Sequence, residues 1–237
     1  MKRLILVAVF LSSLLFADAR RWTPPQPASG GGPTFTAISN NTAYNGGSST
    51  TITVNATSVQ AGDLVVLWAC NYAGTTMTVS DGTSSLTGLT VTSSGANLTG
   101  QFFYLTSSVA TGTVTYTVTY GVASTARAAN VYVFRPSASC SFDTQASLSQ
   151  AASGTAVTTN SITTGSGTVL TFAAQYNENA VNSSAETINS VTADGAIRTA
   201  VASTWYRATT STYTGGGAAT LAGSSRWCAI SCSFRIP

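Results

Sequence analysis

Acid–base chemistry in this chain would have to rest on carboxylates, because the sequence contains no histidine. Without imidazole, neither Ser-His-Asp nor Cys-His catalysis is available, and a zinc site with histidine ligands is excluded. Lysine occurs only at position 2, which removes Schiff-base chemistry from the rest of the chain. The carboxylates beyond residue 19 are Asp63, Asp81, Asp143, Glu178, Glu186 and Asp194.

These carboxylates are scattered along the sequence rather than paired. A glycosidase needs two facing carboxyl groups, whereas Asp81-Gly82 and Asp194-Gly195 are typical of β-turns, in which glycine supplies a positive φ. We therefore expect no catalytic residues and no enzymatic activity. A carbohydrate hydrolase or lyase that uses Glu178 or Glu186 is the alternative.

The segment from residue 176 to residue 186 is rich in oxygen ligands. Asn177, Glu178 and Glu186 form a weak candidate site for Ca²⁺, which prefers carboxylate and amide oxygens. The alternative is a solvated loop, and we expect no metal and no cofactor.

An aromatic and cationic cluster is formed by Trp205, Tyr206 and Arg207. This combination would suit stacking on a sugar ring, so we treat it as a candidate ligand-binding site. Because side chains alternate along a strand, Trp205 and Tyr206 point to opposite faces, and at least one of them should belong to the core.

Residues 1–19 have the features of a signal peptide. Lys2 and Arg3 precede an apolar run over residues 4–16, and Ala17-Asp18-Ala19 is the small-residue pattern that signal peptidase recognises. As a helix the run reaches roughly 20 Å, too short for a hydrocarbon core of ~30 Å. We expect a secreted protein, extracellular or at the cell surface, that is not membrane-bound after cleavage.

Export makes the N-x-S/T sequons candidate sites of glycosylation. A chain rich in threonine and asparagine also generates such sequons by chance, and their use depends on the host. The sequon asparagines are Asn40, Asn55, Asn97 and Asn182.

The cysteine count of four indicates two disulfides in an exported chain. Cys228 and Cys232 lie in one predicted strand with Cα atoms roughly 13 Å apart, whereas a disulfide needs less than about 7 Å. They must therefore pair with Cys70 and Cys140. Because the end of one antiparallel strand faces the start of the next, we favour bonds 70–228 and 140–232. The reversed pairing and four buried free thiols are the alternatives.

Short β-strands dominate the chain after a Pro- and Gly-rich arm at residues 20–33. Residues 113–120 (TVTYTVTY) alternate with period two, while residues 63–70 and 168–174 are apolar on both faces and should be central strands. Further strands are expected at residues 34–39, 50–55, 76–80, 86–92, 101–106, 126–135, 140–147, 155–164, 187–193, 196–207, 217–222 and 226–236. No segment has a helical period, so residues 34–237 are predicted to form an all-β, antiparallel sandwich.

A weak internal repeat relates residues 50–136 to residues 155–237. Matching dipeptides occur in the same order in both: Asp81-Gly82 with Asp194-Gly195, Phe103-Tyr104 with Trp205-Tyr206, and Phe134-Arg135 with Phe234-Arg235. Such an order indicates an old duplication. The halves would form two tandem sandwiches or one larger one. Because no linker-like stretch separates residue 136 from residue 140, we favour one interlocked sandwich.

The succession AGDLVVL, DG, FFYLT, TVTYTVTY and VYVFRP resembles a broad group of jelly-roll domains found in secreted bacterial surface proteins and phage tail appendages. The similarity covers most of residues 50–237 and rests on strand and turn signatures. It implies a β-sandwich in an extracellular or virion-surface role. The group has no common catalytic residues to transfer.

Composition and charge favour a structural role. Charged residues make up 7% of the chain, against about 25% in a typical soluble protein. The net charge of +3 without a basic stretch after residue 21 argues against nucleic acid as a partner. We expect a secreted, non-catalytic structural or surface protein. A glycan-binding module is the alternative.

Self-assembly is a further expectation from the sequence. Soluble sandwiches usually protect their strand edges with charges, lysine above all, and this chain has no lysine beyond position 2. Residues 34–39 would add to the sheet of a neighbouring copy and give a homo-oligomer or filament. The alternative is that these residues pair within their own chain.

Overall fold

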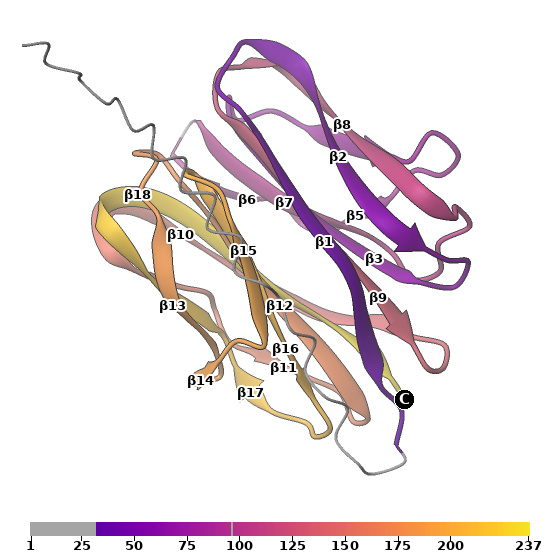
Figure 1. Ribbon diagram of the computed structural model, residues 1–237. Coiled ribbons are helices and arrows are strands. Elements are labelled where there is room, and N and C mark those ends of the chain that lie inside the picture. Colours follow the sequence, from indigo (N-terminus) through magenta and orange to yellow (C-terminus); the bar gives the residue numbers. More distant parts are fainter. Residues whose placement is uncertain (1–31, 96) are drawn as a thin grey trace, which may run out of the picture.

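The computed structural model describes residues 32–95 and 97–237. The predicted signal peptide at residues 1–19 and the arm up to residue 31 lie outside the described residues. Throughout the described part the chain is built from antiparallel strands and contains no helix (Figure 1), so the predicted all-β sandwich is confirmed. No helix suited to crossing a membrane occurs among the described residues.

The first half of the chain, up to residue 136, forms two layers. The inner sheet has the order β1-β9-β3-β7-β5, with β6 also paired to β7; these strands are β1 (Phe35–Asn45), β9 (Arg127–Pro136), β3 (Leu64–Tyr72), β7 (Leu98–Leu105), β5 (Thr87–Gly88) and β6 (Thr92–Ser94). The outer sheet contains β2 (Ser49–Val59), β8 (Gly112–Ser124) and β4 (Met77–Ser80), in the order β2-β8-β4. This division of strands between two sheets is jelly-roll-like.

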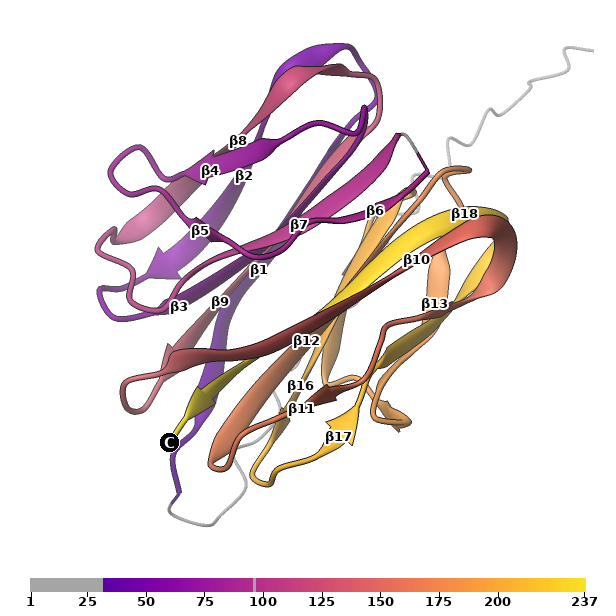
Figure 2. The ribbon, with the colours of Figure 1, turned by 180° about the vertical axis from the view of Figure 1, so that it is seen from behind.

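The second half uses longer, bent strands, as Figure 2 shows for β10 and β18. Its main sheet has the order β14-β13-β18-β12-β16-β15, with β10 also paired to β18. Its strands are β10 (Ser141–Thr158), β12 (Thr168–Asn177), β13 (Ser183–Ile188), β14 (Val191–Thr192), β15 (Gly195–Arg198), β16 (Ala202–Thr209) and β18 (Gly217–Ile236), and a small sheet pairs β11 (Ile162–Thr163) with β17 (Thr214–Gly215). Segments predicted as separate strands at 217–222 and 226–236 are therefore one continuous strand.

Burial follows the sequence patterns. In β8, Val114, Tyr116, Val118 and Tyr120 are buried, while the intervening threonines face outward. In β3 and β12 nearly every residue is buried, because each strand is central and its sheet is covered on both faces. The two predicted central strands are confirmed.

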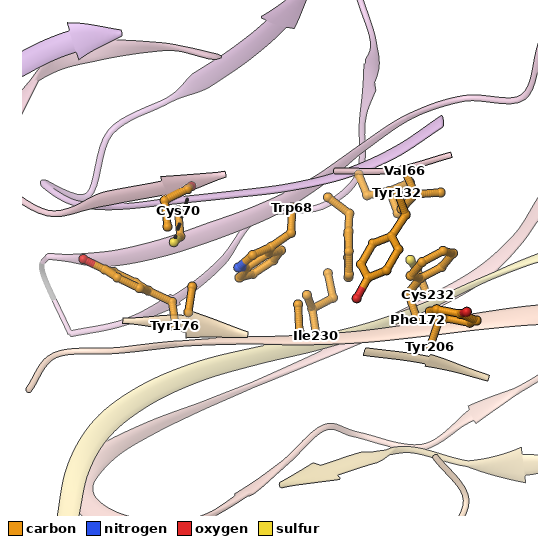
Figure 3. Packing of buried hydrophobic residues seen from close by; sticks show 14 of the residues in the cluster. Val66, Trp68, Cys70, Tyr132, Phe172, Tyr176, Tyr206, Ile230 and Cys232 are labelled. Atoms are coloured by element: carbon orange, nitrogen blue, oxygen red, sulfur yellow. Dashed lines mark hydrogen bonds between the residues drawn. The ribbon is translucent and has the colours of Figure 1, made fainter. Parts of the chain in front are cut away.

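Three apolar cores hold the layers together. One lies between the two sheets of the first half and one lies within the second half. The third and largest lies where the inner sheets of the two halves face each other (Figure 3), with Trp68 and Tyr132 from one sheet pointing toward Phe172 and Ile230 from the other. Every strand ladder among the described residues joins strands of the same half, so the halves meet through side chains.

The duplication is visible in the strand register. Leu64 in β3 lies opposite Phe134 in β9, and Leu170 in β12 lies opposite Phe234 in β18. Two residues further along the central strands, Val66 lies opposite Tyr104 and Phe172 lies opposite Tyr206. The central strands and their two neighbours therefore correspond pair by pair.

A β-bulge recurs at the same place in both halves. The register of β1 shifts between Ala37 and Ser39, and that of β10 shifts between Phe142 and Thr144. Ala37 and Phe142 lie opposite the corresponding phenylalanines, Phe134 and Phe234. A shared bulge is a detail that composition alone does not explain, because bulges are specific features of a fold.

The match between Asp81-Gly82 and Asp194-Gly195 is wrong. Thr87 of β5 lies opposite Tyr104, and Gly195 of β15 lies opposite Tyr206. Since Tyr104 and Tyr206 correspond, Gly195 corresponds to Thr87 and Asp194 corresponds to Leu86. The two Asp-Gly dipeptides thus occupy different turns.

Residues 35–45 are paired with β9 of their own chain, so the strand proposed for addition to a neighbouring copy is already in use. The adjacent edge of β2 is bridged by β1 side chains: Ser39 Oγ accepts a hydrogen bond from the Thr57 amide at 3.1 Å, and Asn41 Nδ2 donates to the Asn55 carbonyl at 3.0 Å. Several other edge strands are very short. In the absence of lysine from these edges, side-chain bridges and short edge strands protect the sheets from pairing with other chains.

Candidate functional site

Arginine engages four of the carboxylates described in the structure. Asp63 pairs with Arg135 (Nε–Oδ1 2.9 Å), Asp143 with Arg235 (Nε–Oδ1 3.5 Å), Glu178 with Arg226 (Nε–Oε2 2.6 Å) and Glu186 with Arg198 (Nε–Oε1 2.6 Å). The other two bind backbone amides. Asp81 Oδ1 accepts hydrogen bonds from Thr83 and Ser84, and Asp194 Oδ2 accepts one from Ala208 at 2.7 Å.

The most buried of the glutamates is Glu186 in β13, which is 4% exposed. Arg198 of β15 donates hydrogen bonds to both of its carboxylate oxygens, and Ser183 Oγ donates one to Oε1 at 2.9 Å. Burial by itself raises the pKa of Glu186. The hydrogen bonds from Arg198, from a backbone amide and from Ser183, together with the charge of Arg198, outweigh burial, so the pKa lies below its usual value. Glu186 is therefore a fixed anion and lacks the raised pKa of a catalytic acid.

A hollow of about 530 Å³ opens beside this ion pair. Its walls come from β13, β14, β15 and the turn between the last two. The lining residues are Ala185, Glu186, Thr187, Thr192, Ala193, Asp194, Gly195, Ala196 and Arg198. Its volume is within the range typical of small-ligand sites, as is that of a second hollow of about 450 Å³ beside Cys140. The hollow beside Glu186 is the one of these two with charged side chains in its walls, which makes it a candidate binding site.

Glu178 lies at the boundary between the two halves and has neighbours from both. Tyr72 at the end of β3 donates a hydrogen bond from its hydroxyl to Oε1 at 2.8 Å, and Arg226 of β18 binds both oxygens. The Arg226 guanidinium, followed by the Tyr72 hydroxyl, lowers the pKa of Glu178. This glutamate links the two halves.

The weak Ca²⁺ candidate is not gathered into one site. Asn177 is fully buried, its Nδ2 donates to the Val181 and Val201 carbonyls, and its Oδ1 accepts from the Val181 amide. Glu178 and Glu186 are each held by a different arginine. No group of three or more aspartate, glutamate or cysteine ligands occurs among the described residues.

The aromatic cluster in β16 belongs to the core. Trp205 is 0% and Tyr206 is 2% exposed, and Trp205 Nε1 donates to the Thr187 carbonyl at 2.9 Å. Arg207 is half-buried and donates from Nη1 to the Ile188 carbonyl at 3.4 Å. Stacking of a sugar on these rings would need them at the surface, so the suggested site at residues 205–207 is wrong. Alternation predicted at least one core aromatic, and both are buried because each face of β16 contacts a separate core.

The cysteines are free thiols in the structure. In the pairing of β10 with β18, Gln145 lies opposite Cys232 and Ser141 lies opposite Arg235. Cys140 comes directly before Ser141, so it is displaced from Cys232 by about four residues, or roughly 13 Å along the strand. The favoured 140–232 bond is therefore wrong, because a disulfide needs Cα atoms within about 7 Å.

The other favoured pair lies in the core between the inner sheets. Cys70 and Cys228 are both buried there, and the Cys70 thiol donates to the Ala128 carbonyl at 3.7 Å. Burial raises the pKa of both thiols, that of Cys228 to about 12. The two predicted disulfides are not found. The alternative of four buried free thiols holds for Cys70, Cys228 and Cys232, whereas Cys140 is a free thiol that is only half-buried.

The sequon asparagines lie at the surface. Asn40 is in β1, Asn55 in β2, Asn97 before β7 and Asn182 before β13, and each is exposed. Their positions are accessible to modification. Their use as glycosylation sites stays a prediction.

Two residues of the hollow were missed by sequence reasoning. Arg198 had no functional signal, because a single arginine near a strand end is typical of any surface. Asp194 was interpreted as a turn residue, which it is, although it also lines the hollow. Comparison of the chain with protein-family models, with curated proteins and with solved structures gives no match.

Proposed function

We propose that this chain is a secreted, non-catalytic structural or surface protein. The observation that carries the proposal is the engagement of every carboxylate described in the structure, by arginine or by backbone amides. Hydrolysis of glycosides requires one carboxyl group that is protonated near neutral pH. Both glutamates have lowered pKa values, which suits structural anions.

The shape of the molecule supports the same role. The inner sheets of the two halves bury one continuous core, in which Phe172 contacts the rings of Phe102, Tyr132, Phe134 and Phe234. Short or bridged edge strands protect an exposed sheet from pairing with other chains. We do not extend the proposal to assembly through residues 34–39, because that strand is occupied by β9.

Two measurements test this proposal. In the first, antibodies against the purified protein are applied to intact and permeabilised source cells and to the culture medium. Signal at the surface or in the medium, in a form lacking residues 1–19, is expected. Signal that appears only after permeabilisation contradicts secretion.

In the second, the secreted form is incubated with soluble polysaccharides, and reducing ends are quantified. No turnover is expected. Turnover that is lost in Glu178→Gln or Glu186→Gln, but retained in the turn variant Asp81→Asn, would assign the protein to the carbohydrate-active enzymes instead.

A further inference from the structure

We propose that the hollow beside Glu186 and Arg198 binds a neutral, hydroxyl-rich ligand, namely a sugar unit of an extracellular glycan. This inference goes beyond the structural role and does not depend on it. It rests on three features of the hollow: a bulge that turns Glu186 inward, an exposed carboxylate where the other half has a buried leucine, and walls that carry both hydrogen-bond donors and acceptors.

A bulge in β13 places Glu186 inside. Ser184 lies opposite Thr220 and Thr187 lies opposite Ala218, so that Ala185 and Glu186 together face a single residue of β18. Ala185 has a φ of 53°, a left-handed conformation that alanine rarely adopts. Bulges redirect side chains, and this one leaves Glu186 facing Arg198 in the wall of the hollow.

The duplication provides an internal comparison for the opening. Asp194 corresponds to Leu86, because Gly195 and Thr87 lie opposite the corresponding residues Tyr206 and Tyr104. In the first half, Leu86 is 6% exposed and belongs to the core between the two sheets. In the second half, Asp194 is exposed and lines the hollow. The same position is thus closed by an apolar side chain in one half and lined by a carboxylate in the other.

The hollow contains the Glu186–Arg198 ion pair and one further carboxylate, that of Asp194, whose Oδ2 accepts a hydrogen bond from the Ala208 amide. Glu186 and Arg198 neutralise each other, so an anion would meet Glu186 and Asp194, and a metal cation would meet the Arg198 guanidinium. The hydrogen bonds of Asp194 and Arg198 among the described residues use Oδ2 of Asp194 and Nε and Nη2 of Arg198, so Oδ1 and Nη1 remain available as an acceptor and a donor. Sugar hydroxyls both donate and accept, which matches this pair.

The remaining walls supply further hydrogen-bonding groups. Thr187 and Thr192 line the hollow, and their hydroxyls can donate or accept. No aromatic residue lines it, so a sugar would be held by hydrogen bonds without ring stacking. We therefore expect weak binding to a single unit, which repeated units along a polysaccharide would reinforce when several copies of the protein are displayed together.

The test is saturation-transfer NMR with the secreted form and four soluble probes: cellotriose, chitotriose, maltotriose and mannotriose. At millimolar concentration, at least one of the four trisaccharides is expected to show saturation transfer from the protein. Asp194→Leu copies the first half and should abolish it. Asp81→Leu is the matched control, because it makes the same change at the other turn aspartate, which lies outside the hollow.

A second variant keeps the test decisive if the Asp194→Leu protein does not fold. Thr192→Val keeps the shape of the side chain but removes a hydroxyl, and should weaken binding about tenfold. Absence of transfer to all four probes overturns the proposal. Equal binding by the wild type, Asp194→Leu and Thr192→Val also overturns it, because the sugar would then occupy another surface. Neither result bears on secretion or on the lack of turnover.

Discussion

The hydroxyl of Tyr72 donates a hydrogen bond to the carboxylate of Glu178 at 2.8 Å, and thereby joins the end of β3 in the first half to the second half. Arg226 holds the same carboxylate from β18. This polar contact lies at the end of the core that the two inner sheets share. It fixes the relative position of the halves at a point where apolar packing gives way to solvent.

Tyr72→Phe removes the hydroxyl that makes this bond between the halves. We expect the melting temperature at pH 7 to fall by about 2–4 °C, since one partly exposed hydrogen bond is lost in a chain of this size. Differential scanning calorimetry measures the change. The control is Tyr44→Phe, an exposed tyrosine whose hydroxyl makes no bond among the described residues; an equal shift in both variants would contradict the role of Tyr72.

Glu186→Gln should destabilise the protein by about 1–3 kcal/mol at pH 7, because it leaves Arg198 without its anion while the half-exposed guanidinium stays partly solvated. Urea unfolding gives the free energy. Asp81→Asn serves as the control for loss of a carboxylate in a turn. A loss no larger than that of the control would show that the ion pair adds little.

The pH dependence of Glu186 follows from its lowered pKa. The unfolded carboxyl titrates near pH 4.3, and the folded one titrates at lower pH. Its contribution to stability is therefore complete above the unfolded pKa and is lost as the pH falls through the folded pKa. The difference in melting temperature between wild type and Glu186→Gln should shrink from pH 6 to pH 3. A difference that is constant over this range would contradict the assignment.

Phe172→Ala should cost about 3–5 kcal/mol, because this ring contacts aromatic residues of both halves in the shared core. Since the core is continuous between the halves, we expect unfolding to remain a single transition. Thr115→Ala on the exposed face of β8 should change stability by less than about 0.5 kcal/mol. Two separate transitions in the wild type would show that the halves unfold independently.

Gly100→Ala tests the close packing of β7 on Trp68. A Cβ atom at position 100 would lie 2.2 Å from Cη2 of the Trp68 ring, so the ring or the strand must move at a cost of about 1–3 kcal/mol or more. Gly46→Ala is the control, because the nearest atom to its Cβ is 3.4 Å away. Equal stability of the two variants would contradict this packing.

Cysteine alkylation tests the thiol assignment. Cys140 is half-buried, and burial raises its pKa to about 11, so its reaction with iodoacetamide should accelerate about tenfold per pH unit up to that value. The three buried cysteines should react only after unfolding. Peptide mapping of the secreted form under non-reducing conditions identifies each site, and a bond between Cys70 and Cys228 would restore one of the expected disulfides.

Much of the fold could be predicted from local patterns. Period-two alternation identified the inward face of β8, and unbroken apolar runs identified β3 and β12 as central strands. The bends of β10 and β18 could not be predicted, because the small residues between the expected strands suit a turn and a bent strand equally. The two-sided burial of β16 was also hidden, since it depends on which sheets cover it.

The hollow was beyond prediction for a different reason. Its shape depends on a one-residue mismatch between β13 and β18, and a bulge at Ala185 leaves no mark on the sequence because glycine, its usual residue, is absent there. The arginine partners of the carboxylates could not be predicted either. Glu186 and Arg198 are brought together because β13 pairs with β18 and β15 pairs with β16. Only register, a property of the assembled sheets, determines such contacts.

The shared core has a further consequence when its two sides are compared. Leu64, Val66, Trp68 and Cys70 face it from β3, and the corresponding residues of β12, Leu170, Phe172, Ala174 and Tyr176, face it from the other side. The contact is therefore isologous, as in a symmetric homodimer. Fusion in one chain makes the association unimolecular, so that it persists at any dilution. Fusion also allows the sequence of each half to change independently of the other. One half can thereby acquire an open, charged hollow while the corresponding position of the other half stays filled by an apolar side chain.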